Sequence, residues 1–211
     1  MVAKYGQNGI NNMLHITNNS FYTCKPHTRD ELLKIIIERI KDEGPECDLN
    51  DIDVSEIEDM SYLFNANPVL MSGGNEIFKN FNSDISQWNV SNVKDMKWMF
   101  NECEKFNSDL SRWNVSNVTK MHVMFCGCKA FNSDISGWNV SNVTNMANMF
   151  NGCEIFNCNL SKWDVSSVNN INYMFVDCKN FRQNLDKWNV SNRIDMINAF
   201  YNCPTQPKWY K

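Results

Sequence analysis

The sequence repeats itself every 25 residues, and this period limits the folds that are open to the chain. Tryptophan recurs five times at that interval, at Trp88, Trp113, Trp138, Trp163 and Trp188. Phenylalanine keeps the same interval in two further series, and cysteine keeps it from Cys103 to Cys203. A short fixed period is typical of stacked repeats, in which each repeat is one supersecondary unit that contacts its neighbours. We therefore expect one elongated solenoid.

The repeat divides the chain into five parts. These are a lead-in at 1–27, an N-terminal capping helix at 28–44, a degenerate first repeat with an inserted loop at 45–80, five regular repeats at 81–203 and a C-terminal tail at 204–211. The insertion carries Pro68, Gly73 and Gly74, which are typical of a loop. In the tail, Trp209 and Tyr210 are expected to fold back over the last repeat.

The segment 28–44 has the signals of a helix with one apolar side. Thr28 suits the N-cap, Glu31 completes a capping box, and Gly44 with Pro45 ends the helix. Apolar residues recur at helical spacing, at Leu32, Leu33, Ile36, Ile37 and Ile40. Because the end of a solenoid exposes an apolar cross-section, we expect this helix to cover it. An amphipathic helix that binds a partner is the alternative.

Each regular repeat reads approximately F-N-S-D-I/L-S-x-W-N-V-S-N-V-T-x-M-x-x-M-F-x-x-C. The alternation near the end of 85–90 predicts a short strand with one buried face. Ser91 is then expected to cap a short helix with Met96, Met99 and Phe100 at near-helical spacing. The expected fold class is thus an α/β solenoid of short parallel strands and short helices, with an N-terminal capping helix.

The recurring motif W-N-V-S-N-V-T-x-M-x-x-M-F, with F-N-S-D-I-S before it, resembles the BspA-like surface-protein repeat family. That family is often grouped with leucine-rich repeats and occurs in bacteria, some protists and large DNA viruses. The resemblance covers roughly residues 26–203. It implies a leucine-rich-repeat-like solenoid with a role in adhesion or protein binding, and it implies no catalytic activity.

Charge and hydropathy exclude several classes of partner. The net charge of −4 leaves no basic footprint for nucleic acid. No run of about 18 apolar residues predicts insertion into a membrane, and residues 1–7 lack the apolar core of a signal peptide. We therefore expect a cytoplasmic or virion-associated protein, with exposure at a cell surface only if a leader has been removed.

The nine cysteines do not predict a disulfide framework or a metal site. Their number is odd, and five of them share one repeat position, which is typical of small buried apolar residues. Cys126 and Cys128 form a lone pair without a second pair or a histidine at metal-binding spacing. We expect neither a metal nor a cofactor.

Asp84, Asp109 and Asp134 share one repeat position that becomes Asn159 and Asn184 further along the chain. A ladder of stacked carboxylates could hold calcium. The alternative is that each side chain accepts backbone N–H bonds and fixes a turn. The change to asparagine favours the turn, because asparagine keeps the acceptor and removes the charge.

No Ser/His/Asp set and no phosphate-binding loop recurs, so we expect no enzyme. Candidate binding residues lie instead at positions that vary between repeats. One series is Gln87, Arg112, Gly137, Lys162 and Lys187; the other, placed on the expected helix, is Trp98, Val123, Asn148, Tyr173 and Asn198. Trp98 and Tyr173 are residues of the kind that anchor protein interfaces. The sequence predicts a non-enzymatic protein–protein interaction module of the adaptor, adhesion or host-interaction type. The alternative is a self-associating structural block of a virion or another assembly.

Overall fold

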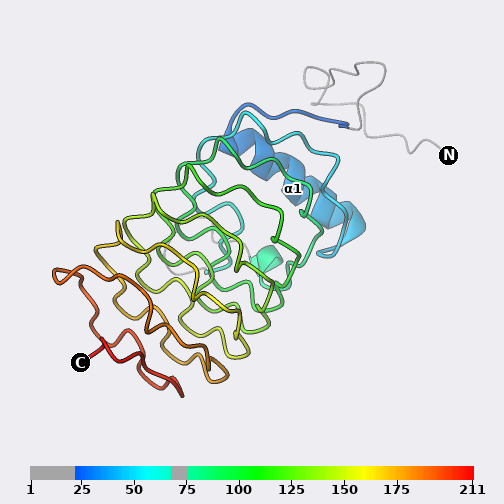
Figure 1. The fold of residues 1–211 in the computed structure, drawn as a ribbon. Coiled ribbons are helices and arrows are strands. Elements are labelled where there is room, and N and C mark those ends of the chain that lie inside the picture. Colours follow the sequence, from blue (N-terminus) through cyan, green and yellow to red (C-terminus); the bar gives the residue numbers. More distant parts are fainter. Residues whose placement is uncertain (1–21, 68–75) are drawn as a thin grey trace.

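The computed structural model describes residues 22–67 and 76–211. The chain winds into coils that lie on one another in sequence order, from the N-terminal helix to the C-terminus (Figure 1). The named elements of the described residues are the helix α1 (Arg29–Glu43) and the short 3₁₀ helix η1 (Glu76–Phe78). The predicted insertion at Pro68, Gly73 and Gly74 lies outside the described residues.

The expected α/β solenoid of the leucine-rich-repeat-like kind is wrong. Within the described residues no strand forms at 85–90 or its counterparts, and no helix forms at 91–100. Each coil is instead a succession of turns. Isolated parallel bridges join neighbouring coils, for example between Asp95 and Lys120 and between Lys120 and Asn145.

Left-handed residues explain why the expected helix is absent. The Met99 N–H donates to the Met96 carbonyl at 3.3 Å, and Trp98 between them has a φ of 61°. A positive φ at this place is typical of a type II turn and cannot continue an α-helix. The same position is left-handed in the other coils, at Val123, Asn148, Tyr173 and Asn198. A second left-handed residue follows at Glu102 (φ 63°). The helix-like spacing of the apolar residues thus comes from consecutive turns.

From the position of Met96 to that of Glu102, backbone hydrogen bonds between coils run in one direction. Two residues earlier the direction is reversed, since the Thr119 N–H donates back to the Lys94 carbonyl at 2.9 Å. In the first regular coil four alternate amides donate to carbonyls of the next coil: Met96 to Lys120 at 3.0 Å, Trp98 to His122 at 3.1 Å, Phe100 to Met124 at 2.9 Å and Glu102 to Cys126 at 2.7 Å. We call these four positions and their equivalents the amide ladder. Its N–H groups point toward the C-terminal end of the stack, and the carbonyls that accept from them point toward the N-terminal end.

The core consists of columns of identical side chains. The indoles of Trp88 and Trp113 stack with their centroids 6.4 Å apart, and the Trp113 Nε1–H donates to the Ile85 carbonyl of the preceding coil at 3.1 Å. The recurring cysteines are free, and four of the five are fully buried, which confirms the predicted burial. The Cys128 thiol donates to the Phe100 carbonyl at 3.0 Å. Each coil therefore completes hydrogen bonds of the coil before it.

The N-terminal end of the stack is covered by α1 (Figure 1). Its buried residues Leu32, Ile36 and Ile40 belong to the same core as the coils. The predicted N-cap is present, since the Thr28 side chain accepts from the Glu31 N–H. The expected capping box is shifted by one residue, because the Glu31 carboxylate accepts from the His27 N–H at 2.8 Å.

The C-terminal tail covers part of the opposite end, as the sequence predicts. The Trp209 ring stacks on Trp188 with centroids 6.2 Å apart, and its Nε1–H donates to the Leu185 carbonyl at 2.8 Å. The Tyr210 ring meets Phe200 edge-on at 5.0 Å. The tail thus takes the place of the aromatic residues of a further coil.

Candidate functional site

The first predicted series lies on an exposed face of the coils. Gln87, Arg112, Lys162 and Lys187 are all exposed, and each precedes a buried tryptophan. Within residues 22–67 and 76–211, Arg112, Lys162 and Lys187 form no ion pair. We call these three residues the basic row. Its charges are open to a partner.

The aspartate column on the same face fixes turns, as the second hypothesis predicts. The Asp84 carboxylate accepts from the Ser86 N–H at 2.9 Å, and the Asn159 amide oxygen accepts from the Ser161 N–H at 3.0 Å. At Asp134 the hydrogen bond from the Ser136 side chain, followed by that from its amide, lowers the pKa of the carboxyl. The described residues contain no group of three or more His, Cys, Asp or Glu that could hold a metal ion.

The second predicted series lies on turns rather than on a helix. Trp98 is half-buried, and its ring stacks on Tyr62 with centroids 5.8 Å apart. Val123 is 7% exposed and belongs to the core. Tyr173 is 38% exposed. Of the two expected anchors, Tyr173 thus offers the freer ring.

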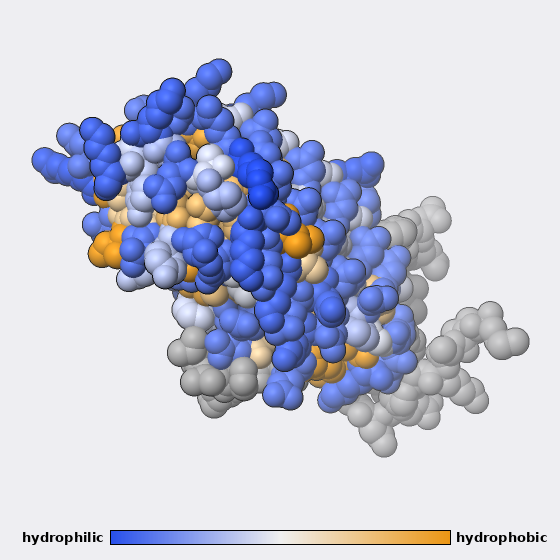
Figure 2. Space-filling model, turned by 90° about the horizontal axis from the view of Figure 1, so that it is seen from below, coloured by the Kyte–Doolittle hydropathy of each residue, from blue (hydrophilic) through white to orange (hydrophobic). Residues whose placement is uncertain are grey.

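Two further apolar residues, which the sequence analysis missed, join Tyr173. Ile197 is 60% and Tyr201 is 64% exposed, the largest values among the exposed large apolar residues that the structure describes. The Tyr173 N–H donates to the Ile197 carbonyl at 2.9 Å, and the Asp177 N–H donates to the Tyr201 carbonyl at 3.1 Å, so these residues lie on adjoining coils. Apolar surface is visible among hydrophilic residues at this end of the stack, on the left of Figure 2. We call Tyr173, Ile197 and Tyr201 the terminal apolar cluster.

A comparison between repeats could have found the terminal apolar cluster. The residues at the repeat position of Ile197 are Lys97, His122, Ala147 and Asn172 in the earlier coils. The residues at the position of Tyr201 are Asn101, Cys126, Asn151 and Val176. A terminal repeat is expected to carry polar residues on its outer side, and this one carries the bulkiest apolar residue of each series.

A shallow groove of about 440 Å³ runs across the coils beside the repeat position of Tyr201, because Cys126, Asn151 and Asn202 line it. Gly127 and Gly152 line it together with charged residues, among them Glu102, Lys129 and Glu154. A Cβ atom at Gly127 would lie 2.7 Å from the Glu102 carboxylate, so this glycine leaves space for that side chain.

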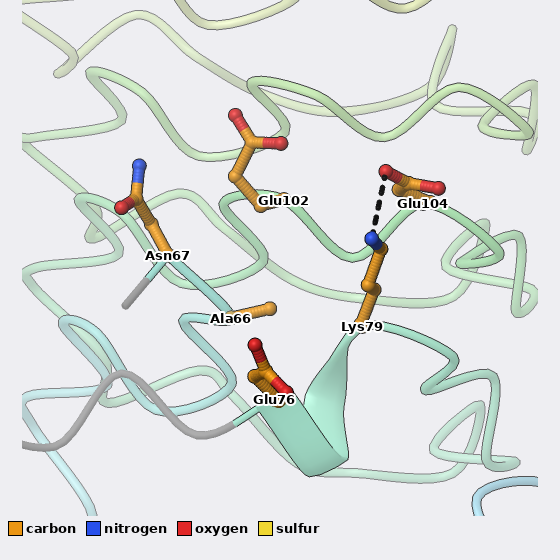
Figure 3. A pocket seen from close by; sticks show the side chains of 6 residues that line it. All are labelled: Ala66, Asn67, Glu76, Lys79, Glu102 and Glu104. Atoms are coloured by element: carbon orange, nitrogen blue, oxygen red, sulfur yellow. Dashed lines mark ion pairs between the residues drawn. The ribbon is translucent and has the colours of Figure 1, made fainter. Parts of the chain in front are cut away.

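A second cavity of about 250 Å³ adjoins the groove at Glu102 (Figure 3). Burial, with a smaller contribution from Glu104, raises the pKa of Glu102. Glu104 pairs with Lys129 at 3.0 Å and with Lys79 at 3.6 Å. The two cavities thus share one half-buried carboxylate beside an ion-paired one.

In the part of the chain that the structure describes, no helix is both long and apolar enough to cross a membrane.

Comparison with known proteins identifies the family of the chain. A family described as "Mycoplasma protein of unknown function, DUF285" matches twice, over residues 39–140 and over residues 110–209. Among curated proteins and among solved structures, no match is found. The two matches cover well over half of the chain, which therefore belongs to this family of Mycoplasma proteins of unknown function.

Proposed function

We propose that this protein is a non-enzymatic module that binds another protein. The observation that carries the proposal is the terminal apolar cluster, with Ile197 at 60% and Tyr201 at 64% exposure on the last coil. Exposed apolar side chains that lie together mark interaction sites, and tyrosine is enriched among the residues that dominate binding energy. The resemblance to BspA-like repeats supports the same function, and that relationship remains a prediction.

The basic row is a second surface that such a module could use. Arg112, Lys162 and Lys187 present exposed charge, which affects the rate of association and its salt dependence more than the final affinity. The apolar cluster is expected to supply most of the binding free energy. The expected setting in the cytoplasm or a virion is also part of the proposal.

A structural block that stacks on copies of itself is less well supported. Stacking would need both ends of the coil to be open, and α1 covers the N-terminal end. A heterologous contact of this kind would also produce open filaments rather than a closed assembly.

The test is capture of partners from the organism that encodes the protein, with quantitative mass spectrometry. Wild type is compared with Ile197→Ser/Tyr201→Ser and with Arg112→Ser/Lys162→Ser/Lys187→Ser. Ile155→Ser is the matched control, because Ile155 is 46% exposed and lies outside the cluster.

The proposal expects one protein that wild type and Ile155→Ser enrich and that the double variant loses. The basic-row variant should bind the same protein more weakly at low salt. Equal capture by all four forms, or enrichment of only the chain itself, would contradict the proposed function.

A further inference from the structure

The amide ladder has the same direction in successive coils, because the amides of each coil donate to carbonyls of the next coil. In the second regular coil the Met121 N–H donates to the Asn145 carbonyl at 3.1 Å, and the Val123 N–H donates to the Ala147 carbonyl at 2.8 Å. Every coil thus offers donors on its C-terminal side and needs acceptors there. Among the described residues no further coil follows the last one to supply them.

The donors of the last coil have no acceptor among residues 22–67 and 76–211. They are the amides of Met196, Asn198, Phe200 and Asn202. Phe200 is buried beneath Trp209 and Tyr210. By contrast, Met196 is half-buried, and Asn198 and Asn202 are exposed. The tail therefore closes the middle of this edge and leaves both sides of it open.

A second copy of the chain is a poor partner for this edge. The matching carbonyls at the N-terminal end belong to residues 59, 61, 63 and 65. The Ser61 carbonyl already accepts from the Arg29 guanidinium at 3.2 Å, and Leu63 and Asn65 are buried at 0% and 4% exposure. Two C-terminal edges that face each other along the amide ladder would place donors against donors. The edge therefore calls for carbonyl groups from a different chain.

The side chains beside the open amides favour an apolar partner. Ile197 lies between Met196 and Asn198 in the sequence, and it adjoins Tyr173 through the hydrogen bond of 2.9 Å between their backbones. A chain that accepts from the two open amides would pass over these side chains. Backbone hydrogen bonds and apolar contacts would then form together, as in recognition by strand addition.

We propose that this edge binds an extended segment of a partner protein, which accepts from the Met196 and Asn198 amides and covers the terminal apolar cluster with apolar side chains. The coil interior shows the required form, because Asn145 and Ala147 present carbonyls two residues apart to the preceding coil. The inference rests on the proposed function and specifies the form of the partner.

The first test is amide hydrogen exchange of the free monomer, resolved by residue with NMR. The Met196 and Asn198 amides should exchange on the order of a hundredfold faster than those of Met121 and Val123, which are bonded inside the stack. Equal protection of the two pairs would overturn the proposal, since the edge would then already be occupied.

The second test supplies an extended segment as a probe. Residues 144–149, which contain Asn145 and Ala147, are fused behind Lys211 through a Gly/Ser linker of about 12 residues, whose root-mean-square span is about 20 Å. The control carries Gly/Ser in place of the segment. Tethering gives an effective concentration in the millimolar range, so exchange at Met196 and Asn198 should slow by about twofold or more in the fusion alone.

The same fusion with Ile197→Ser and Tyr201→Ser should lose that protection. Identical exchange in fusion and control would contradict the inference. If protection of the Met196 and Asn198 amides in the unfused chain rises with protein concentration, the edge binds a second copy of the chain. That result would also contradict the inference.

The two levels of the account can fail separately. If native partner capture depends on Ile197 and Tyr201 while the fused segment gives no protection, the proposed function stands and the strand-like mode of binding is wrong. If the fused segment protects the Met196 and Asn198 amides while partner capture is unchanged by the substitutions at Ile197 and Tyr201, the edge can bind an extended segment but the proposed function is wrong.

Discussion

At the scale of the residue, each recurring side chain satisfies the backbone of a neighbouring coil or its own turn. The indole of Trp138 donates to the Leu110 carbonyl at 3.0 Å, and the Cys153 thiol donates to the Phe125 carbonyl at 3.0 Å. These carbonyls lie in the core, where an unpaired polar group costs about 1–3 kcal/mol. The period of the sequence is thus a period of hydrogen bonds as well as of packing.

Replacing Trp138 by Phe should lower the free energy of unfolding by about 2 kcal/mol, because the Leu110 carbonyl loses its donor and some volume is lost. Trp98→Phe is the control, since Trp98 is half-buried and its stacking on Tyr62 survives in an aromatic replacement. Urea unfolding measures both. Equal effects of the two substitutions would contradict the role given to the indole hydrogen bond.

Two neighbouring glutamates should respond to pH in opposite directions. Burial raises the pKa of Glu102 above the pKa of the same carboxyl in the unfolded chain. The free energy of unfolding therefore falls as the pH rises past the unfolded pKa, because ionisation of Glu102 is less favourable in the folded state. The hydrogen bond from Lys129 lowers the pKa of Glu104, so its stabilisation is present above the unfolded pKa and is lost as the pH falls through the folded pKa.

At pH 7, Glu102→Gln should therefore raise the melting temperature and Glu104→Gln should lower it. At about pH 3, where both carboxyls are largely protonated in the unfolded chain, the variants should approach wild type. Thermal unfolding followed over this range is the measurement. Shifts of the same sign at pH 7 would show that the two carboxylates are not distinguished in this way.

At the scale of the element, the sequence predicts α1 well and the coils poorly. Thr28 and Gly44 mark the helix ends directly, because capping depends on local chemistry that the sequence displays. Trp98 and Tyr173 are left-handed even though bulky residues disfavour a positive φ, so no local propensity reveals their turns. The spacing of Met96, Met99 and Phe100 fits a helix equally well.

The candidate site divides in the same way. The asparagines and aspartates that fix turns are predictable, because the change from Asp134 to Asn159 retains only the acceptor. The exposure of Ile197 and Tyr201 follows from their place on the last coil that the structure describes, and no pattern within one repeat contains that information. The groove beside Glu102 depends on left-handed glycines whose positions the turns determine.

Truncating the buried face of α1 should destabilise the whole stack. Ile36 is 0% exposed, so Ile36→Ala should cost about 2–5 kcal/mol in the free energy of unfolding. Glu38→Ala on the exposed side should change it by less than about 0.5 kcal/mol. Removal of residues 28–44 should cause aggregation. A soluble truncation that unfolds cooperatively would show that α1 is dispensable as a cap.

At the scale of the whole molecule, the two ends of the stack differ. At the N-terminal end the Ser61 carbonyl accepts from Arg29 of α1, whereas at the other end Asn198 and Asn202 stay exposed beside the tail. Repeat proteins depend on their ends for solubility, because interior repeats are covered on both sides. An end that is covered over its aromatic core and open on the two sides of its amide ladder is suited to a partner.

The tail should be required for stability. Trp209→Ala removes the stacking on Trp188 and the hydrogen bond to the Leu185 carbonyl. Because Trp209 is half-buried, we expect a loss of about 2 kcal/mol in the free energy of unfolding. Lys211→Ala, at the exposed last residue, is the control. Chemical denaturation measures the free energy of unfolding of both variants. An unchanged value for Trp209→Ala would contradict the capping role of the tail.

The most direct test of the central claim is a hydroxyl-radical footprint of the protein alone and in complex with the partner captured from its own organism. The account predicts that Tyr173, Ile197 and Tyr201 become protected in the complex, while Ile155, which is 46% exposed elsewhere on the coils, reacts as before. Protection that avoids these three residues, whether along the basic row or in the groove beside Glu102, would contradict binding at the C-terminal end.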